Sequence, residues 1–301
     1  MGRTITVDLD YLGRPGIISV YAAPTGDGGF VLLDSGPAST LEALERGIEA
    51  AGFPLGSLRA VLLTHIHLDH AAAAGTLSRR TGCEVWAHPD GIVHLEDPGA
   101  RLLPSALRLY GSRLESLFGT MEGAPADRLH AVQHGAALRF GPLEVVGWHT
   151  PGHARHHVAW QVGDEIATGD VAGVRMAGSS HVLPPMPPPD IDLAAWHASL
   201  DLLRGIEPRR LLVTHFGGFD DAGRHLDELE HRLRRWAAIA EEVVRDGGDV
   251  ASLGVRLAAQ DDLEMTAAGV PDAQRSLYFK LCPMVENSTG LYRYVKRQLR
   301  A

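Results

Sequence analysis

The segment that follows the apolar run AVLL at 60–63 limits what this chain can fold into more than any other segment does. A short continuous apolar run is typical of a buried strand, and here it leads directly into THIHLDH, with His65, His67, Asp69 and His70. In an extended backbone His65 and His67 lie on one side, and Asp69 and His70 follow as the chain turns into a helix. Imidazole and carboxylate donors together suit zinc, manganese or iron. The segment therefore predicts a strand that ends in a metal site.

The same arrangement occurs four more times along the chain. An apolar run is followed by Asp34 in VLLD, by His153 in VVGWHTPGH, by Asp170 in EIATGD and by His215 in LLVTH. Strand ends on one edge of a sheet are close in space even when they are far apart in sequence. We therefore expect these side chains at the edge that carries THIHLDH. The chain has 16 histidines, so their positions matter more than their number.

The remaining pattern predicts a mixed α/β body. Prolines exclude the loop LPPMPPPDID at 183–192 from helices and central strands. Ser39 or Thr40 is expected to cap the first helix. Strands are expected at 17–23, 30–33, 60–63, 84–88, 143–149, 157–162, 164–168 and 209–215, and helices at 39–51, 71–80, within 101–118 and at 191–206.

The pattern becomes entirely helical from about residue 222. The apolar residues there recur at the spacing of one helix face, and they are Leu226, Leu229, Leu233, Trp236, Ala240 and Val243. We therefore divide the chain into a catalytic body, 1–219, and a helical appendage, 220–301. The appendage either shapes a substrate pocket, covers the edge of the sheet or forms the interface of a homodimer.

Composition narrows the classes of partner. The formal net charge of -9 argues against a main role in binding nucleic acid or an anionic membrane. No apolar run approaches the roughly 20 residues of a membrane span, and the first residues lack the pattern of an export signal, so we expect a cytoplasmic protein with a small-molecule substrate. Cys83 and Cys282 are interpreted as core residues, and the NST triplet at 287–289 as chance.

Five motifs in this order resemble the metallo-β-lactamase superfamily. They are DSG at 34–36, THIHLDH at 64–70, TPGH at 150–153, TGD at 168–170 and VTH at 213–215. The resemblance extends over about residues 16–217. It implies an αββα four-layer sandwich with a metal site at the sheet edges, here with a C-terminal helical appendage.

The resemblance also implies two divalent metal ions, zinc first, with manganese or iron as alternatives. It places Asp34 beneath the site as a residue that orients ligands, and it gives Asp69 a catalytic role in orienting the nucleophile or carrying a proton. The implied ligands are His65, His67 and His153 for the first ion, Asp69, His70 and His215 for the second, and Asp170 between them. His215 stands in THFG, which departs from the pattern of the glyoxalase II branch.

The implied chemistry is hydrolysis. A metal pair lowers the pKa of bound water to about 7, so a metal-bridged hydroxide would cleave a small ester-like substrate: a thioester, a lactone or a similar carbonyl compound. The chain has no GxSxG nucleophile elbow, which favours metal-activated water over a serine nucleophile.

Two other activities remain open. A persulfide dioxygenase-like oxidoreductase would hold a single iron through His65, His153 and Asp170, and the complete second ligand set argues mildly against it. A phosphodiesterase or nuclease would use the same ligands, but the chain lacks a basic footprint. Flavin-dependent relatives have Glu where His67 stands.

Several further side chains are candidates for substrate contact. Four of them flank His153, and His181 could line the cleft. The four are His149, Arg155, His156 and His157. The other histidines, which are interpreted as surface or core residues, are His88, His94, His130, His134, His197, His225 and His231.

Overall fold

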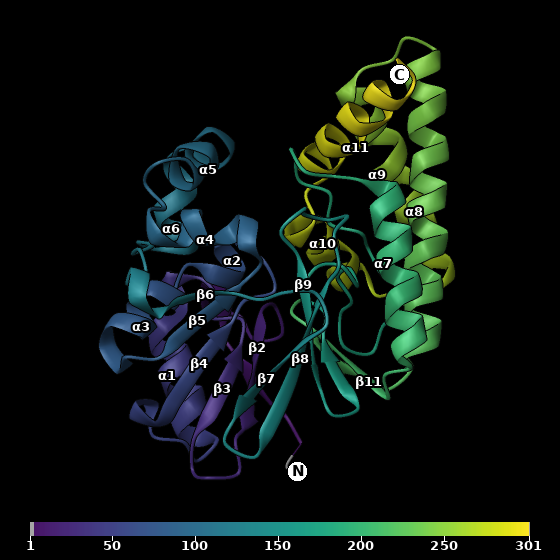
Figure 1. Ribbon diagram of the computed structural model, residues 1–301. Helices are drawn as coiled ribbons and strands as arrows, with labels where there is room; N and C mark the ends of the chain where they lie inside the picture. Colours follow the sequence, from purple (N-terminus) through teal and green to yellow (C-terminus); the bar gives the residue numbers. More distant parts are fainter. Residues whose placement is uncertain (1–2, 301) are drawn as a thin grey trace.

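The structure, a computed structural model, describes residues 3–300 and contains two six-stranded sheets packed face to face (Figure 1). The first sheet has the order β1 to β6, and the second has the order β12, β11, β10, β9, β8, β7. The strands are β1 (Ile5–Asp8), β2 (Ser19–Pro24), β3 (Phe30–Leu33), β4 (Leu58–Leu62), β5 (Glu84–Ala87), β6 (Leu129–Ala131), β7 (Ala136–Phe140), β8 (Leu143–His149), β9 (Val158–Val162), β10 (Glu165–Ala167), β11 (Arg210–Val213) and β12 (Gly217–Phe219).

Helices cover the outer faces of both sheets. Those before residue 120 join the apolar cluster of the first sheet, and those after residue 190 join that of the second, while side chains of α10 contact both clusters (Figure 1). They are α1 (Leu41–Ala50), α2 (Leu68–Ala71), α3 (Ala74–Thr81), α4 (Pro89–Glu96), α5 (Leu102–Tyr110), α6 (Leu114–Phe118), α7 (Leu193–Ile206), α8 (Ala222–Arg245), α9 (Val250–Ala267), α10 (Asp272–Leu281) and α11 (Met284–Gln298). The expected αββα sandwich with C-terminal helices is confirmed.

Strand β3 shows how the sequence produces these layers. Its four residues FVLL are all buried, and successive side chains point to opposite faces of a strand. Phe30 and Leu32 join the apolar cluster beneath the outer helices, whereas Val31 and Leu33 join the cluster between the two sheets. A sheet covered on both faces therefore reads as a continuous apolar run.

The parallel pairs bring the chemistry-bearing segments to one edge. In the first sheet β3 runs parallel to β4, and in the second β10 runs parallel to β11. Two side chains tie the sheets together near these strand ends: the Tyr21 hydroxyl donates to the Val213 carbonyl at 2.6 Å, and the Trp160 indole donates to the Leu63 carbonyl at 3.0 Å. The carboxyl ends of four strands thus meet at one place.

The expected cap of α1 is wrong. Thr40 stands directly before the helix, but its side chain makes no capping bond. Its hydroxyl donates instead to the Pro37 carbonyl at 2.9 Å, and the Ser39 hydroxyl donates to the Leu117 carbonyl. A short 3₁₀ turn at Ala38–Thr40 leads into the helix, and the hydroxyls of Ser39 and Thr40 donate to carbonyls outside α1.

The helices after residue 220 share their core with the second sheet. Leu229 and Trp236 of α8 belong to the same buried cluster as Ile166 of β10 and Leu211 of β11. Among residues 3–300, no helix combines the length and apolar character needed to cross a membrane.

Candidate metal centre

The ends of four strands deliver the predicted donors to one edge of the sandwich. His65 and His67 lie between β4 and α2, and Asp69 and His70 lie within α2. The other three follow strands of the second sheet, at His153 after β8, Asp170 after β10 and His215 after β11. The structure brings all seven side chains together in two adjacent groups of donors.

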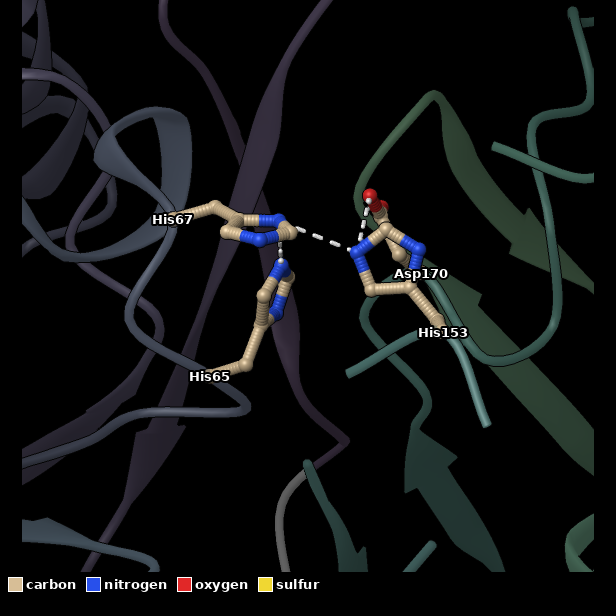
Figure 2. Close-up of side chains that lie close together, drawn as sticks. All are labelled: His65, His67, His153 and Asp170. Atoms are coloured by element: carbon tan, nitrogen blue, oxygen red, sulfur yellow. Dashed lines mark hydrogen bonds and ion pairs between the residues drawn. The ribbon is translucent and has the colours of Figure 1, made fainter. Parts of the chain in front are cut away.

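The first group consists of three imidazoles and one carboxylate (Figure 2). His67 Nδ1 lies 2.9 Å from His65 Nε2 and 3.0 Å from His153 Nε2. Asp170 Oδ2 lies 3.4 Å from His153 Nε2. Nitrogens that bind one tetrahedral zinc ion at 2.0–2.1 Å are about 3.3 Å apart, so this spacing suits a single cation.

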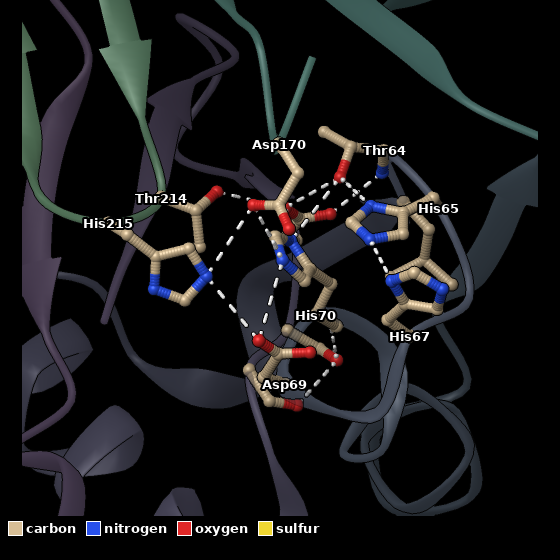
Figure 3. A network of polar contacts seen from close by, with 12 residues as sticks. Thr64, His65, His67, Asp69, His70, Asp170, Thr214 and His215 are labelled. Atoms are coloured by element: carbon tan, nitrogen blue, oxygen red, sulfur yellow. Dashed lines mark hydrogen bonds and ion pairs between the residues drawn. The ribbon is translucent and has the colours of Figure 1, made fainter. Parts of the chain in front are cut away.

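The second group lies beside the first and contains Asp69, His70 and His215 (Figure 3). Asp69 Oδ2 is 3.4 Å from His215 Nε2 and 3.8 Å from His70 Nε2. The other oxygen of Asp170, Oδ1, lies 3.3 Å from His70 Nε2 and 3.5 Å from His215 Nε2. Asp170 therefore offers one carboxylate oxygen to each group.

The hydrogen bonds of two imidazoles fix which ring nitrogen faces the other donors. His153 Nδ1 lies 2.8 Å from the Pro185 carbonyl, and His215 Nδ1 lies 3.2 Å from the Ile17 carbonyl. Because a carbonyl only accepts, each Nδ1 carries the hydrogen and donates it. Each Nε2 then presents its lone pair to the other donors, which is the arrangement of a metal-binding histidine.

Asp34 holds His70 in the same way and also supports the segment before it. Its Oδ2 lies 2.8 Å from His70 Nδ1 and accepts from the Thr64 hydroxyl at 2.9 Å, while Oδ1 accepts from the Thr64 backbone N–H at 2.7 Å. Asp34 itself has a φ of 61°, a conformation that is uncommon outside glycine. It lies where the sequence predicted, beneath the donors.

Among the side-chain atoms of these two groups, two are buried and have no hydrogen-bond partner within residues 3–300. They are His70 Nε2 and Asp170 Oδ1, which face each other at 3.3 Å. A buried polar atom without a partner is costly, and a cation at this position would satisfy both. The residues present therefore fit divalent metal binding.

The two groups of donors differ in how their surroundings shift the pKa values of their histidines. Burial, together with the neighbouring imidazoles, lowers the pKa of His65 far below its ordinary value and that of His67 to about 3. These rings are therefore neutral and able to bind a cation at physiological pH.

The second group is dominated by its carboxylates. Burial alone would lower the pKa of His70, but Asp170 and Asp69 raise it well above the ordinary value. Burial would likewise raise the pKa of Asp170, but His70 and other imidazoles hold it well below the usual range. Ionised carboxylates thus face these imidazoles, as a cation site requires.

A pocket of about 510 Å³ opens onto the donors. Arg155 and His156, which the sequence placed near the substrate, line this pocket, whereas His149 and His157 do not. His149 Nε2 lies 3.0 Å from the Val132 carbonyl, and His157 Nδ1 lies 2.8 Å from the Thr150 hydroxyl.

Other parts of the lining differ from expectation. His181 is buried against the ring of Tyr278 and does not line the pocket, whereas His94, interpreted as a surface or core residue, does. Tyr110 of α5 and Glu286 of α11 also line it. No motif marks these two residues, because only the packing of α5 and α11 brings them to the pocket.

Comparison with known proteins identifies the family. The model of the metallo-beta-lactamase superfamily matches residues 13–215, which include all seven donors. The chain belongs to the metallo-beta-lactamase superfamily. Members of this superfamily are mostly metal-dependent hydrolases, and the donor groups of this chain suit divalent metal binding.

Two similar sequences and one similar structure illustrate the likeness to known proteins. A metallo-beta-lactamase fold-containing protein from Sulfurisphaera tokodaii is 27% identical over 67% of this chain and 74% of its own length. A hydroxyacylglutathione hydrolase from Acidiphilium cryptum is 30% identical over 74% of this chain and 75% of its own. The fold resembles a metallo-beta-lactamase family protein from Thermus thermophilus with a TM-score of 0.72 and 20% identity, over 98% of this chain and 93% of the other.

Proposed function

We propose that this chain is a dinuclear metal-dependent hydrolase that cleaves a small ester-like substrate, a thioester or a lactone. The observation that carries the proposal is the position of Asp170, whose two oxygens lie 3.4 Å from His153 Nε2 and 3.3 Å from His70 Nε2. A carboxylate shared in this way between two donor groups suits a pair of cations better than a single ion. We therefore assign the seven side chains as ligands, with zinc as the first choice of metal.

The residues of the chain have separable roles in this proposal. When bound, the metal pair supplies water acidic enough to ionise near neutral pH and polarises the substrate carbonyl. Asp69 borders both the second group and the pocket, so its carboxylate is placed to orient the attacking water and to accept a proton. Asp34 fixes His70 through Nδ1 at 2.8 Å.

One observation supports an ester-like bond, and a second supports a small-molecule substrate. The Acidiphilium cryptum relative is named a hydroxyacylglutathione hydrolase, and its substrate class is a thioester. The pocket beside the donors has about 510 Å³, within the range of roughly 300–1,000 Å³ for small-molecule sites. A carbonyl compound of moderate size can therefore reach Asp69 and the donor groups.

The first test is the metal content of protein purified without added metal or chelator. About two zinc or manganese ions per chain would support the dinuclear hydrolase. About one iron per chain, with oxygen consumption in the presence of persulfides, would replace it with the dioxygenase-like oxidoreductase. Protein that binds no metal even after reconstitution would refute both assignments.

A matched pair of variants sharpens this test. Asp170→Asn removes the charge shared by the two groups, so it should bind at most one ion per chain and lose hydrolysis of thioesters and lactones. Asp246→Asn makes the same change at the exposed end of α8 and should keep both properties. Two tightly bound ions in Asp170→Asn would contradict the shared-carboxylate assignment.

A further inference from the structure

Three separate elements build the walls of the pocket above the donors. Its floor includes His67, Asp69 and Asp170. One wall is α5, the second is the proline-rich loop, and the third is the junction of α10 and α11 in the helical appendage. The appendage therefore contributes directly to the space that a substrate of this site would occupy.

Apolar side chains line the pocket from all three walls, beside polar residues such as Tyr110 and Glu286. Leu102, Ala106 and Leu109 line the pocket from α5, and Leu281 and Pro283 line it from the α10–α11 junction. The proline-rich loop adds Pro185 and the run 187–189. These side chains offer no hydrogen bonds to a ligand, so they favour hydrocarbon over polar groups.

The wall formed by the α10–α11 junction is held in place by packing against both sheets' apolar clusters. Leu281 packs against the cluster of the first sheet and against the cluster of the second sheet. Asn287, which also lines the pocket, accepts from the Met186 backbone N–H at 2.8 Å. A wall fixed in this way leaves a pre-formed apolar slot, which is how small-molecule sites are usually built.

The three arginines of the lining lie at its margin. Arg101 and Arg108 are exposed, and the Arg155 side chain is 63% exposed while it lies 3.9 Å from Asp90. Exposed ion pairs contribute little affinity. The apolar side chains of the walls therefore supply binding energy for the hydrocarbon part of a ligand, and the arginines face the part that remains in water.

We propose, on the basis of the hydrolase function above, that the substrate is an ester or thioester of a linear apolar acyl chain. The acyl chain lies between α5 and the α10–α11 junction, and the alcohol or thiol portion of the substrate points toward the arginines at the margin. Water adds across the acyl–oxygen or acyl–sulfur bond, which yields a carboxylate, an alcohol or thiol and one proton. The specificity-determining residues are Leu102, Ala106 and Leu281.

The primary experiment measures kcat/KM of the metal-loaded full chain on acetyl, butanoyl, hexanoyl and octanoyl thioesters of one thiol. Each buried methylene strengthens binding about fourfold at most. We expect kcat/KM to rise at least about tenfold from acetyl to hexanoyl, mainly through a lower KM. A flat profile, or a preference for acetyl, would overturn the proposal.

Variants test whether the acyl chain of the substrate lies where we place it. Ala106→Phe fills the slot from α5 and should reduce the ratio of octanoyl to acetyl kcat/KM at least about tenfold. Leu107→Phe introduces the same side chain at the next position, which is 55% exposed and outside the lining, and should keep the wild-type ratio. An unchanged ratio in Ala106→Phe would place the acyl chain elsewhere.

A second variant covers the case in which phenylalanine at position 106 disturbs the fold. Leu281→Ala widens the slot from the opposite wall, so the optimum should shift toward longer or branched acyl groups. The folding of every variant is checked by far-UV circular dichroism and thermal unfolding. An unshifted optimum in folded Leu281→Ala would overturn the assignment of this wall.

A binding experiment separates the pocket from the chemistry. Metal-free protein is titrated with butanol, hexanol and octanol by calorimetry, and affinity should rise with chain length in the wild type and less steeply in Ala106→Phe. If octanol binds selectively but no thioester or lactone is hydrolysed by metal-loaded protein, the hydrolase function fails and the apolar slot stands. If hydrolysis occurs but affinity does not depend on chain length, the slot fails and the hydrolase stands.

Discussion

Asp34 connects the backbone of two strand ends to the candidate metal centre. Besides its bonds to Thr64 and His70, its Oδ2 accepts from the Thr214 hydroxyl at 3.4 Å. Thr214 precedes His215, so one carboxylate contacts segments from both sheets. A residue that orients metal ligands in this way commonly changes metal affinity 10–100-fold when it is replaced.

Asp34→Asn should therefore weaken metal binding while it preserves the shape of the side chain. The amide can still accept from the Thr64 backbone N–H, but its NH₂ group would face the Nδ1–H of His70. We expect a loss of metal affinity of about 10–100-fold and a loss of about 1–3 kcal/mol in the free energy of unfolding. Metal titration and chemical denaturation check both, and wild-type affinity in this variant would show that His70 does not depend on Asp34.

The seven proposed ligands could be located from sequence for a simple reason. Each follows an apolar run, and such runs are the strands whose ends the sandwich brings together. Tyr110 and Glu286 could not be found in this way, because they lie on α5 and α11 and reach the pocket only through helix packing. Periodicity shows which face of a helix is buried, but it does not show what lies opposite that face.

At the scale of elements, the turn after β10 is shaped by Gly169. It has a φ of 47°, which is unfavourable for residues with a Cβ. A Cβ at this position would lie 2.5 Å from the Thr64 hydroxyl oxygen and 2.7 Å from the Thr64 Cβ. Thr64 cannot move away because Asp34 holds both its backbone and its hydroxyl.

Gly169→Ala is therefore expected to destabilise the fold and to displace Asp170. The strained conformation alone costs about 1 kcal/mol or more, and the contact with Thr64 adds to it. Gly163→Ala is the matched control, since Gly163 has a φ of 59° but no heavy atom within 4 Å of an added Cβ. Thermal unfolding and metal content should separate the two variants, and equal behaviour would mean that the turn tolerates a side chain.

Helices α8 and α9 enclose a buried ionic cluster. Arg232 Nε lies 3.3 Å from Asp261 Oδ1, the Trp236 indole donates to the same oxygen at 3.2 Å, and Arg232 also donates to Glu264 at 2.7 Å. Burial raises the pKa of Asp261 to about 7, against the opposing effect of Arg232. Asp261 Oδ2 has no hydrogen-bond partner within residues 3–300, which leaves a position for the proton.

This raised pKa predicts a pH dependence of stability with a definite sign. Between the unfolded pKa of 3.8 and about 7, the folded chain retains a proton that the unfolded chain has released, so stability falls as pH rises. We expect Asp261 to contribute a loss of about 2 kcal/mol between pH 5 and pH 7. Denaturation of wild type and Asp261→Asn at both values gives this contribution as a difference, and a constant difference would refute the raised pKa.

Long strands and amphipathic helices could be predicted from sequence, but several edge strands could not. β8 coincides with the predicted range, and α7 differs from its prediction by only two residues at its start. Four strands were not predicted: β1, β6, β7 and β12. Each of them lies at the edge of a sheet and has partly exposed side chains, and β6 and β12 have only three residues each. Such strands depend on pairing with a neighbour, and little apolar periodicity marks them.

At the scale of the whole molecule, the appendage and the second sheet share one core. Trp196 of α7 and Trp236 of α8 are both completely buried in the same cluster. Each fully buried large apolar side chain contributes about 1.5–3 kcal/mol. The division proposed at residue 220 follows the change in sequence pattern, while the core crosses that boundary.

This shared core predicts that the full chain unfolds in one cooperative transition. Removal of residues 220–301 would expose Trp196 and Leu200, so the shortened chain should aggregate or remain unfolded. Calorimetry of the full chain and solubility of the shortened chain check the two expectations. Two separate transitions, or a stable fragment 1–219, would instead establish the body as an independently folding domain.

The appendage also reaches the candidate metal centre through a short chain of contacts. Asn287 of α11 accepts from the Met186 N–H at 2.8 Å, and the adjacent Pro185 carbonyl accepts from His153 Nδ1 at 2.8 Å. Asn287→Ala removes the partner of a buried N–H and frees the loop that orients His153. We expect metal affinity to fall about tenfold or more, together with a loss of about 1–3 kcal/mol in the free energy of unfolding.

Thr289→Ala is the control for this effect, because the Thr289 hydroxyl bonds only within α11, to the Val285 carbonyl at 2.5 Å. Metal titration of both variants decides between two roles of the helix. If Asn287→Ala loses affinity and Thr289→Ala does not, α11 positions a ligand of the first group as well as the wall of the pocket. If Asn287→Ala keeps wild-type affinity, the Pro185–His153 bond is maintained by the sandwich alone, and the appendage acts on the pocket without acting on the metal.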